Sequence, residues 1–536
     1  MRWALLVIVA CSSPDRGPRF MGAGHSSPVD GGTLRFAVTD QVRTLDPTVQ
    51  YEETSSYGVH PVYETLIDFE PARREDDRSG YTLEPRLAER WEVSADGLAY
   101  HFWLRDGITF SDGEPVVAGD FVYALDRALT KPDSGYLGFL AGVAGYQDVI
   151  DQKKPHCECF EALNDRELVI HLDKPNRSFL ESLTLSFATP MKRAWVEKVG
   201  DQIQHEALGT GPFEVETWEQ GRRLVLKKNA RYWNASAIHL DRIEMIENVP
   251  RDTQFLMFQA GEIDAAERLS APDYLWIMDQ PAWAPYVQSR AMMYSYGSRM
   301  NVEMKPFTDR RVRQAMNYAV NKQHEVKLLM GAATISHGIL PPGVFGRDDK
   351  LQPYPHDPAK AHALLAEAGY PDGFDVDYVV MSDDEASRLA SSLQADLAEV
   401  GVRVHLQVVT LATYATAIGK RHGAAFGKGT WVGDYPDPAD FFDPLFQSKS
   451  IGDENSSNSS FYSNPALDQL LEDARAEADV TKRAEMYRQA ERIVYDDAPW
   501  IWEYHQSLTE VVQPYLKGYG IHPIRLRDFT RAWLDK

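Results

Sequence analysis

The sequence predicts a mixed α/β protein made of several domains. Its 536 residues would fill about three or four domains of ordinary size. The hydrophobic content of 43% is enough for packed cores. The second half of the chain carries a strand pattern at 376–381, a helix pattern at 387–400 and a strand pattern at 402–408. Because a strand–helix–strand crossover is right-handed and joins parallel strands, these segments predict an α/β lobe after about residue 300.

Alternation of apolar and polar residues predicts the strands of the first half. The pattern holds over residues 33–38 and again over residues 100–104. Asp106 and Gly107 then form a hairpin-type turn signal, which predicts a further strand at 108–110. Residues 33 to about 250 therefore mix strands with helices such as the one predicted at 120–129.

Capping residues predict the helices of the second half. Asp357 and Pro358 form an N-cap and a first-turn proline, and Gly369 ends the helix. Further helical patterns cover 466–478 and 482–494. The preceding segment, 448–460, is rich in Ser and Asn and is expected to be a surface loop.

The charge balance weighs against two classes of partner. Lys and Arg number 56 and Asp and Glu number 79, which gives a formal net charge of -23. Such a charge disfavours nucleic acid and anionic lipid as main partners. No window after the first residues is apolar for long enough to predict a membrane span.

Residues 1–11 have the features of a secretory signal, with Arg2 ahead of a short apolar run. The last four residues of this segment, ending at Cys11, resemble the lipobox of bacterial lipoproteins. That resemblance implies cleavage before Cys11 and a lipid on its sulfur. A start codon misassigned upstream of an ordinary domain is the alternative. Residues 12–32 are rich in Ser, Pro and Gly and are expected to form a flexible tether.

Cys157 and Cys159 are the two remaining cysteines, too few for a disulfide scaffold. Their spacing places the Cα atoms near the upper limit for a disulfide, so an oxidised pair is expected to be strained. A short loop with free or oxidised thiols is predicted. The neighbouring His156 and Glu158 leave metal binding as an alternative.

Motifs for several enzyme classes are incomplete. His324 and Glu325 begin a zinc-protease motif, but Leu328 stands where the second histidine is needed. The glycines before Lys428 do not have phosphate-loop spacing, and Gly429 replaces the required Ser or Thr. No Gly-x-Ser-x-Gly element is present in the sequence.

A series of sequence blocks, in a fixed order, identifies a family resemblance. The blocks are Leu45-Asp46-Pro47, residues 62–66, 83–88, 104–113 and 120–123, Gly209-Thr210-Gly211-Pro212-Phe213, Tyr232-Trp233, residues 311–315, 340–343, 364–370 and 431–438. Together they resemble the family 5 solute-binding proteins, the large oligopeptide, dipeptide and nickel binders of ABC importers. The resemblance extends from about residue 32 to the C-terminus.

The resemblance implies a two-lobed periplasmic-binding-protein-like fold, class II, of the large cluster, with an extra subdomain on lobe one. Carried onto this chain, lobe one is expected at 33–70, 200–295 and 500–536. The extra subdomain is expected at 71–199 and lobe two at 296–499. The chain would cross between the lobes near residues 295 and 500, where it would form a hinge that lets the lobes close over ligand.

The resemblance also implies ligand-binding residues. Asp434 would hold the α-ammonium of a bound peptide; the alternative is a loop carboxylate that caps a turn. Trp431 would form a wall of the same pocket; the alternative is a core tryptophan. Lys428 stands where some relatives have an arginine that meets the ligand carboxylate. Lysine can supply the positive charge but not the two parallel hydrogen bonds that an arginine donates to a carboxylate.

Three further residues complete the implied site. Met300 and Asn301 match a hinge-proximal strand that pairs with the peptide main chain. Arg299, just before them, stands where the peptide binders have an acidic residue, which changes the ligand polarity expected there. Tyr504, with Trp500 and Trp502, would line side-chain pockets or fill the core of lobe one, and core filling is favoured.

The function implied is therefore capture of short peptides outside the cytoplasmic membrane and delivery to the transmembrane subunits of an ABC permease. The protein is expected to be a lipid-anchored monomer of the periplasm or cell surface, with no cofactor, no bound metal and no enzymatic activity. A nickel chelate, haem or an oligosaccharide is the alternative ligand. A hydrolase or a sensory receptor on the same scaffold is the alternative of another class.

Overall fold

The computed structural model describes residues 17–73 and 79–536. An eleven-stranded sheet runs through the molecule in the order β15-β14-β16-β12-β17-β11-β1-β10-β9-β8, with β13 paired to β17. Its strands are β1 (Thr33–Ala37), β8 (Phe213–Glu219), β9 (Arg223–Lys228), β10 (Arg242–Ile246), β11 (Ala265–Glu267), β12 (Val287–Met300), β13 (Ala333–Ile335), β14 (Asp375–Met381), β15 (Arg403–Val409), β16 (Phe426–Val432) and β17 (Trp500–Val512).

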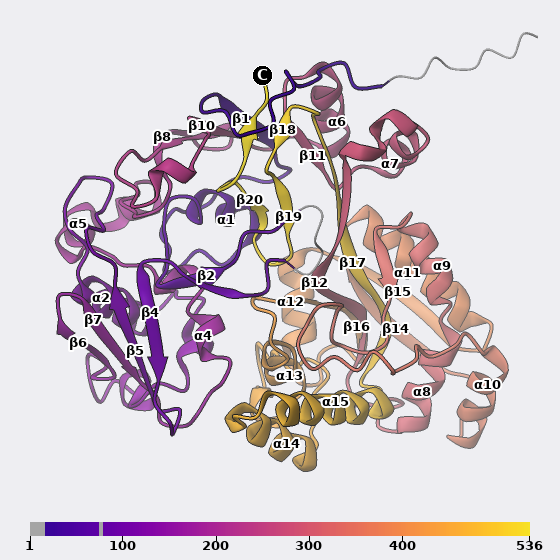
Figure 1. Cartoon of the computed structure of the whole chain (residues 1–536). Helices are drawn as coiled ribbons and strands as arrows, with labels where there is room; N and C mark the ends of the chain where they lie inside the picture. Colours follow the sequence, from indigo (N-terminus) through magenta and orange to yellow (C-terminus); the bar gives the residue numbers. More distant parts are fainter. Residues whose placement is uncertain (1–16, 74–78) are drawn as a thin grey trace, which may run out of the picture.

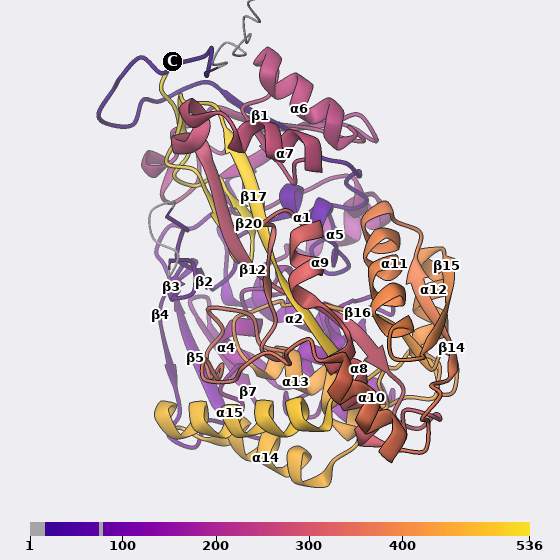
Figure 2. The same cartoon turned by 90° about the vertical axis from the view of Figure 1, so that its right-hand side faces the viewer.

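The two long strands β12 and β17 join two lobes. They pair antiparallel from Val287 opposite Val511 to Arg299 opposite Trp500, with two register shifts between. Strands β1 and β8–β11 lie at one end of the pair, in what we call lobe one, and β14–β16 lie at the other end, in lobe two (Figures 1 and 2). The main chain therefore passes between the lobes as two hydrogen-bonded strands.

A subdomain packs beside lobe one and carries its own sheet, in the order β4-β5-β7-β6. Figure 1 shows it at the lower left, below β2. The strands of these and the remaining small sheets are β2 (Ile67–Phe69), β3 (Leu83–Pro85), β4 (Ala88–Val93), β5 (Ala99–Leu104), β6 (Phe160–Asn164), β7 (Glu167–His171), β18 (Leu516–Lys517), β19 (Gly520–His522), β20 (Leu526–Asp528) and β21 (Trp533–Leu534).

The helices cover the faces of these sheets. Those of lobe one and the subdomain are α1 (Glu53–Val59), α2 (Ala118–Thr130), α3 (Tyr146–Ile150), α4 (Phe179–Ser182), α5 (Arg193–Val199), α6 (Arg251–Ala260) and α7 (Ala271–Met278). Those of lobe two are α8 (Arg310–Ala319), α9 (Lys322–Leu328), α10 (Pro358–Glu367), α11 (Asp384–Ala398), α12 (Leu411–Gly419), α13 (Ala439–Phe446), α14 (Pro465–Ala476) and α15 (Val480–Asp497).

Each part has a separate apolar core. One cluster of buried side chains draws on residues 66–208 and fills the subdomain. A second joins residues 34–63 to 213–294 and 508–534 within lobe one. Two more, drawn from residues 293–502, fill lobe two. Because the cores are separate, relative movement of the lobes need not disrupt any of them.

The predicted strand–helix–strand unit is confirmed. Strands β14 and β15 pair in parallel from Asp375 opposite Arg403 to Met381 opposite Val409, and α11 connects them. The predicted capping at α10 is also confirmed, since the Asp357 carboxylate accepts a hydrogen bond from the Lys360 backbone N–H at 2.9 Å.

Two local predictions are wrong. Residues 108–110 form no strand; Thr109 makes only an isolated bridge with Pro115, and β5 pairs with β4 and β7. The Ser- and Asn-rich segment 448–460 is not an exposed loop throughout, because Asn458 and Ser460 are fully buried. The Asn458 amide donates to the carbonyls of Gln447 and Tyr462, so this polar side chain satisfies backbone groups inside lobe two.

The N-terminal segment is partly fixed to the body. The Ala23 N–H donates to the Asp535 carbonyl at 2.9 Å, and the Gly31 N–H donates to the His239 carbonyl at 2.7 Å. The part of the expected tether from residue 17 onward therefore lies along lobe one. Cys11 and the expected signal lie outside the described residues. Within residues 17–73 and 79–536, no helix is both long enough and apolar enough to cross a membrane.

Candidate ligand-binding cleft

A cleft lies where lobe one, the subdomain and lobe two meet. It is lined by Gln50, Tyr51, Glu52, Glu53, Ser56, His60, Tyr136, Leu185, Ser186, Tyr294, Val432, Gly433, Asp434, Ile524 and Arg525. The loop before α1 and the start of α1 supply the first residues, while the segment after β16 supplies 432–434. Since the lining comes from both lobes, any opening of the lobes changes the cleft.

Asp434 lies two residues beyond the end of β16, where the chain turns toward α13. Its Oδ2 accepts a hydrogen bond from the Tyr51 hydroxyl at 2.8 Å. Its own N–H donates to Oδ2 of Asp440 at 2.9 Å, and the indole N–H of Trp431 donates to the same oxygen at 3.3 Å. Asp440 thereby fixes both predicted residues, and the Asp434 carboxylate lines the cleft.

Burial gives the Asp434 carboxylate an unusual proton affinity. Burial raises the pKa of Asp434 to about 6, although the hydrogen bond from Tyr51 partly offsets that rise. Burial and then the charge of Asp434 raise the pKa of Asp440 well above its ordinary value. A half-buried carboxylate beside a second acidic group is stabilised by an incoming cation, so this corner of the cleft favours an ammonium group.

Aromatic side chains surround this carboxylate and connect the lobes. The Tyr51 ring meets Tyr136 edge-on at 5.4 Å between centroids. Phe139 of the subdomain contacts Tyr435 of lobe two at 6.1 Å in the same manner. Together with the bond from Tyr51 to Asp434, these contacts hold the lobes against each other near the cleft.

Glu53 forms the acidic wall that continues from this corner. Both of its carboxylate oxygens accept hydrogen bonds from the Arg268 guanidinium at 2.7 Å, and the Tyr294 hydroxyl donates to one of them at 3.2 Å. Its charge is therefore compensated within the protein, unlike that of Asp434.

Arg525 supplies positive charge to the cleft. Its guanidinium donates to Asp68 at 2.8 Å and to the Thr184 carbonyl at 2.6 Å. Burial, together with the charge of Arg525, lowers the pKa of the neighbouring His60 to about 3, so this histidine is neutral. The charge of Arg525 is therefore already compensated by Asp68, as that of Glu53 is by Arg268.

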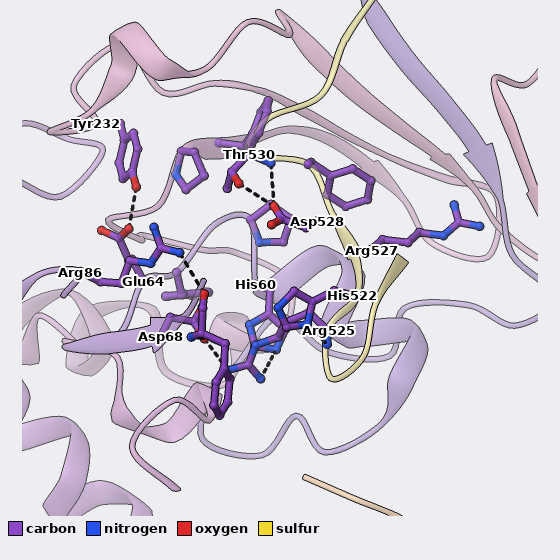
Figure 3. Close-up of a pocket in the computed structure, with 16 residues that line it drawn as sticks. His60, Glu64, Asp68, Arg86, Tyr232, His522, Arg525, Arg527, Asp528 and Thr530 are labelled. Carbon is purple, nitrogen blue, oxygen red and sulfur yellow. Dashed lines mark hydrogen bonds and ion pairs between the residues drawn. The ribbon is translucent and has the colours of Figure 1, made fainter. Parts of the chain in front are cut away.

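A second pocket shares His60 and Arg525 with the cleft and is lined mostly by residues of lobe one (Figure 3). Its acidic side chains are already paired. Glu64 accepts hydrogen bonds from the Tyr232 hydroxyl at 2.6 Å and from Trp233, while Asp528 accepts from Thr530. Because its own neighbours satisfy these groups, this pocket is a weaker ligand site than the cleft.

The other sequence-predicted site residues do not line the cleft. Lys428 is 5% exposed, and its ammonium lies 2.5 Å from the Glu503 carboxylate. Although burial lowers its pKa, the Glu503 charge raises the pKa above the ordinary value. Tyr504 is buried and stacks on Tyr296 at 4.9 Å.

The predicted backbone partners of a peptide are also occupied. Met300 and Asn301 are fully buried. The Met300 N–H donates to the Pro499 carbonyl at 2.9 Å, and the Asn301 N–H donates to the Ala425 carbonyl at 2.8 Å. These two N–H groups therefore have partners within the protein.

Sequence analysis missed Tyr51, Glu53 and Arg525. The first two follow the Leu45-Asp46-Pro47 block closely, so their proximity to that block was an available signal. No local pattern marks Arg525, because it reaches the cleft only through the path of the C-terminal segment between β19 and β20.

Fold and cleft together define a two-lobed ligand-binding protein, and comparisons with known proteins identify its family. The profile described as "Bacterial extracellular solute-binding proteins, family 5 Middle" matches residues 82–453. This chain belongs to that family, whose members act outside the cytoplasm.

Individual relatives cover nearly the whole chain. It is 30% identical to the Heme-binding protein A of Haemophilus influenzae, over 99% of this chain and 98% of the relative. It is 29% identical to the Dipeptide-binding protein of Escherichia coli, over 89% of each. Among solved structures, the periplasmic binding protein DppA of Helicobacter pylori in complex with the peptide STSA matches with a TM-score of 0.79 and 25% identity, over 95% of this chain and 99% of that one. These likenesses confirm the predicted family and two-lobed fold.

Proposed function

We propose that this protein captures short peptides between its lobes outside the cytoplasm and delivers them to the permease of an ABC importer. The observation that carries the proposal is the Asp434 carboxylate, which lines a cleft between the lobes and has an elevated pKa of about 6. A peptide ammonium would neutralise it. The peptide-binding names of relatives support the same ligand class.

The lobe boundaries of the proposal follow the two long strands. Lobe one comprises about 33–70, 200–295 and 500–536, the subdomain 71–199, and lobe two 296–499. Movement about β12 and β17 would then open and close the cleft. The mechanism requires no covalent chemistry, cofactor or metal, and the protein would act as a monomer.

The test compares a free-amine peptide with its N-acetylated form on wild type and Asp434→Asn. Truncating one partner of a buried charge pair costs roughly 2–5 kcal/mol of binding, so the free-amine peptide should lose that affinity in the variant. The acetylated peptide should bind weakly to both proteins. Calorimetry of all four combinations gives the coupling energy.

Asp453→Asn is the matched control, because Asp453 is a carboxylate of lobe two whose side chain is 86% exposed. It should bind both peptides as wild type does. A coupling energy near zero with folded Asp434→Asn protein would remove Asp434 from the site and reject the ammonium subsite.

A lipid on Cys11 would hold the protein at the membrane. Cys11→Ser should then move the protein from the membrane fraction to the soluble fraction after cell breakage, as immunoblotting would show. Retention of the variant in the membrane fraction would contradict the anchor while leaving peptide capture intact.

Haem is the second candidate ligand, since the Heme-binding protein A is 30% identical along nearly the whole chain. The tyrosines of the cleft, Tyr51, Tyr136 and Tyr294, could contact a flat aromatic ligand. Titration with haemin, followed by absorbance, tests this. Saturable binding that a free-amine peptide does not displace would favour haem over peptide.

A further inference from the structure

A second group of reactive side chains lies in the subdomain, apart from the cleft. Cys157 and Cys159 form a disulfide between α3 and β6. The disulfide lines a pocket with Ala144, Gly145, Lys154, His156, Glu158 and His171. Peptide capture makes no use of these residues, and none of the cleft residues lines this pocket.

The backbone holds this pocket in shape. The His171 N–H donates to the Cys159 carbonyl at 2.9 Å, and the Ala144 N–H donates to the His171 carbonyl at the same distance. Sγ of Cys157 lies 3.2 Å from the Ala144 carbonyl. Cys157 and Cys159 are 7% and 2% exposed and both line the pocket, so a small molecule would have to reach the sulfurs through it.

A buried carboxylate orients the histidine beside the disulfide. Asp126 of α2 is 9% exposed. One of its oxygens accepts the Cys157 N–H at 2.9 Å, and the other lies 2.6 Å from Nδ1 of His156. This pairing keeps the proton on Nδ1 when the imidazole is neutral, so Nε2 is the acceptor nitrogen of a histidine that lines the pocket. His156 itself has a 64% exposed side chain.

A purely structural role for the disulfide is the weaker explanation. The two cysteines are separated by only two positions. Since the loop-closure entropy that a disulfide removes from the unfolded chain grows with loop length, so short a loop gains the least stability from the bond. The disulfide lines a pocket and is next to a histidine–carboxylate pair. These features favour a reactive role for the disulfide over a structural one.

We propose that Cys157 and Cys159 form a redox-active disulfide that exchanges with small thiols entering this pocket. A thiolate attacks one sulfur, the Cys157–Cys159 bond breaks, and a mixed disulfide and a cysteine thiolate remain. The released cysteine thiolate takes a proton from the His156 imidazolium. A second thiol resolves the mixed disulfide, so two thiols are oxidised to one disulfide and the cysteine pair is reduced to two thiols.

The charges around the pocket suit this exchange. Lys154 and His171 line it with His156 and favour thiolate over thiol when protonated. Glu158 and Glu161 moderate that charge, at 2.9 Å from Lys154 and 3.6 Å from His171 respectively. The extracytoplasmic setting of the family is one in which disulfides form and persist.

The test measures reduction of the folded, full-length protein by 2-mercaptoethanol. Samples are quenched with an alkylating reagent, and mass spectrometry counts the labels on Cys157 and Cys159. Wild type should be reduced completely at millimolar thiol while its circular dichroism stays unchanged. In His156→Ala the second-order rate constant should fall about a hundredfold, the low end of what one proton-transfer group contributes. Free imidazole should restore part of the lost rate.

His405→Ala is the matched control, because His405 is also exposed and paired with an aspartate, on β15 of lobe two. Its rate constant and its response to imidazole should equal those of wild type. Reduction of wild type only after unfolding would overturn the exchange site. A His156→Ala rate equal to wild type, or no rescue by imidazole, would overturn the role of His156. Cys157→Ser with Cys159→Ser should remain folded and bind the same ligand, which separates this inference from the proposed function.

Discussion

Lys428 and Asp434 lie six positions apart on and just after β16, yet their charges have different surroundings. Lys428 lies within the strand, opposite Ser298 of β12, and its ammonium meets the buried Glu503 of β17, one of the two strands that join the lobes. Asp434 lies beyond the strand end, and its carboxylate accepts a hydrogen bond from a tyrosine hydroxyl of the other lobe. A position inside the sheet makes a charge part of the core, while a position at the strand end makes it available to ligand.

Removing each of the two charges should therefore affect a different property of the protein. The ammonium of Lys428 is neutralised by a buried carboxylate that belongs to the fold. The carboxylate of Asp434 is half-buried without a cation at hydrogen-bond distance among the residues described, and its elevated pKa reflects that surrounding. Removing Lys428 should affect folding, while removing Asp434 should affect binding.

The largest expected effect is that of Lys428→Met on stability. The change leaves the Glu503 carboxylate buried without its cation, which costs about 3–5 kcal/mol for a broken buried pair. Urea unfolding should show this loss as a lower midpoint. The double variant Lys428→Met with Glu503→Gln should recover most of it, because no unpaired charge remains.

Peptide affinity measured on the folded fraction should stay within about twofold of wild type, since Lys428 does not line the cleft. A large loss of affinity for carboxylate-ended peptides alone, with stability unchanged, would show instead that Lys428 reaches the ligand and that the contrast with Asp434 is wrong.

The next effect is the pH dependence of binding at Asp434. Its pKa in the free protein is raised to about 6. Because an ammonium binds the ionised carboxylate, affinity should be constant above about pH 7 and weaken about tenfold per pH unit below 6. Calorimetry between pH 4.5 and 8 measures this, with Asp434→Asn as the control whose affinity should lack this step.

Asp434→Asn should also be at least as stable as wild type at neutral pH without ligand. For a carboxyl whose folded-state pKa is raised, the stabilising contribution exists at low pH and is lost as pH rises through the folded pKa, here about 6. Thermal melts at pH 4.5 and 7.5 check this sign. A variant clearly less stable at pH 7.5 would assign Asp434 a structural role.

Local sequence patterns predicted the structure correctly where residues close together in the chain determine it. The β14–α11–β15 unit followed from alternation and capping, and ordered blocks indicated the family. Local patterns could not predict that Lys428 is buried in an ion pair, because its partner Glu503 is 75 positions away. The same limit explains the burial of Asn458, whose amide serves carbonyls within lobe two, and the approach of Arg525 to the cleft.

The smallest expected effect is that of Tyr51→Phe, which removes the hydrogen bond across the cleft but keeps the ring against Tyr136. A hydrogen bond to a charged group contributes about 1.5–3 kcal/mol, so its loss should shift the ligand-free protein toward more open lobes. Small-angle scattering should give a larger radius of gyration for ligand-free Tyr51→Phe than for wild type. Saturating peptide should return both to one compact profile, because the ligand ammonium then holds Asp434. Identical ligand-free profiles would mean that Tyr51 does not hold the lobes together, and that Asp434 differs from Lys428 only in its exposure.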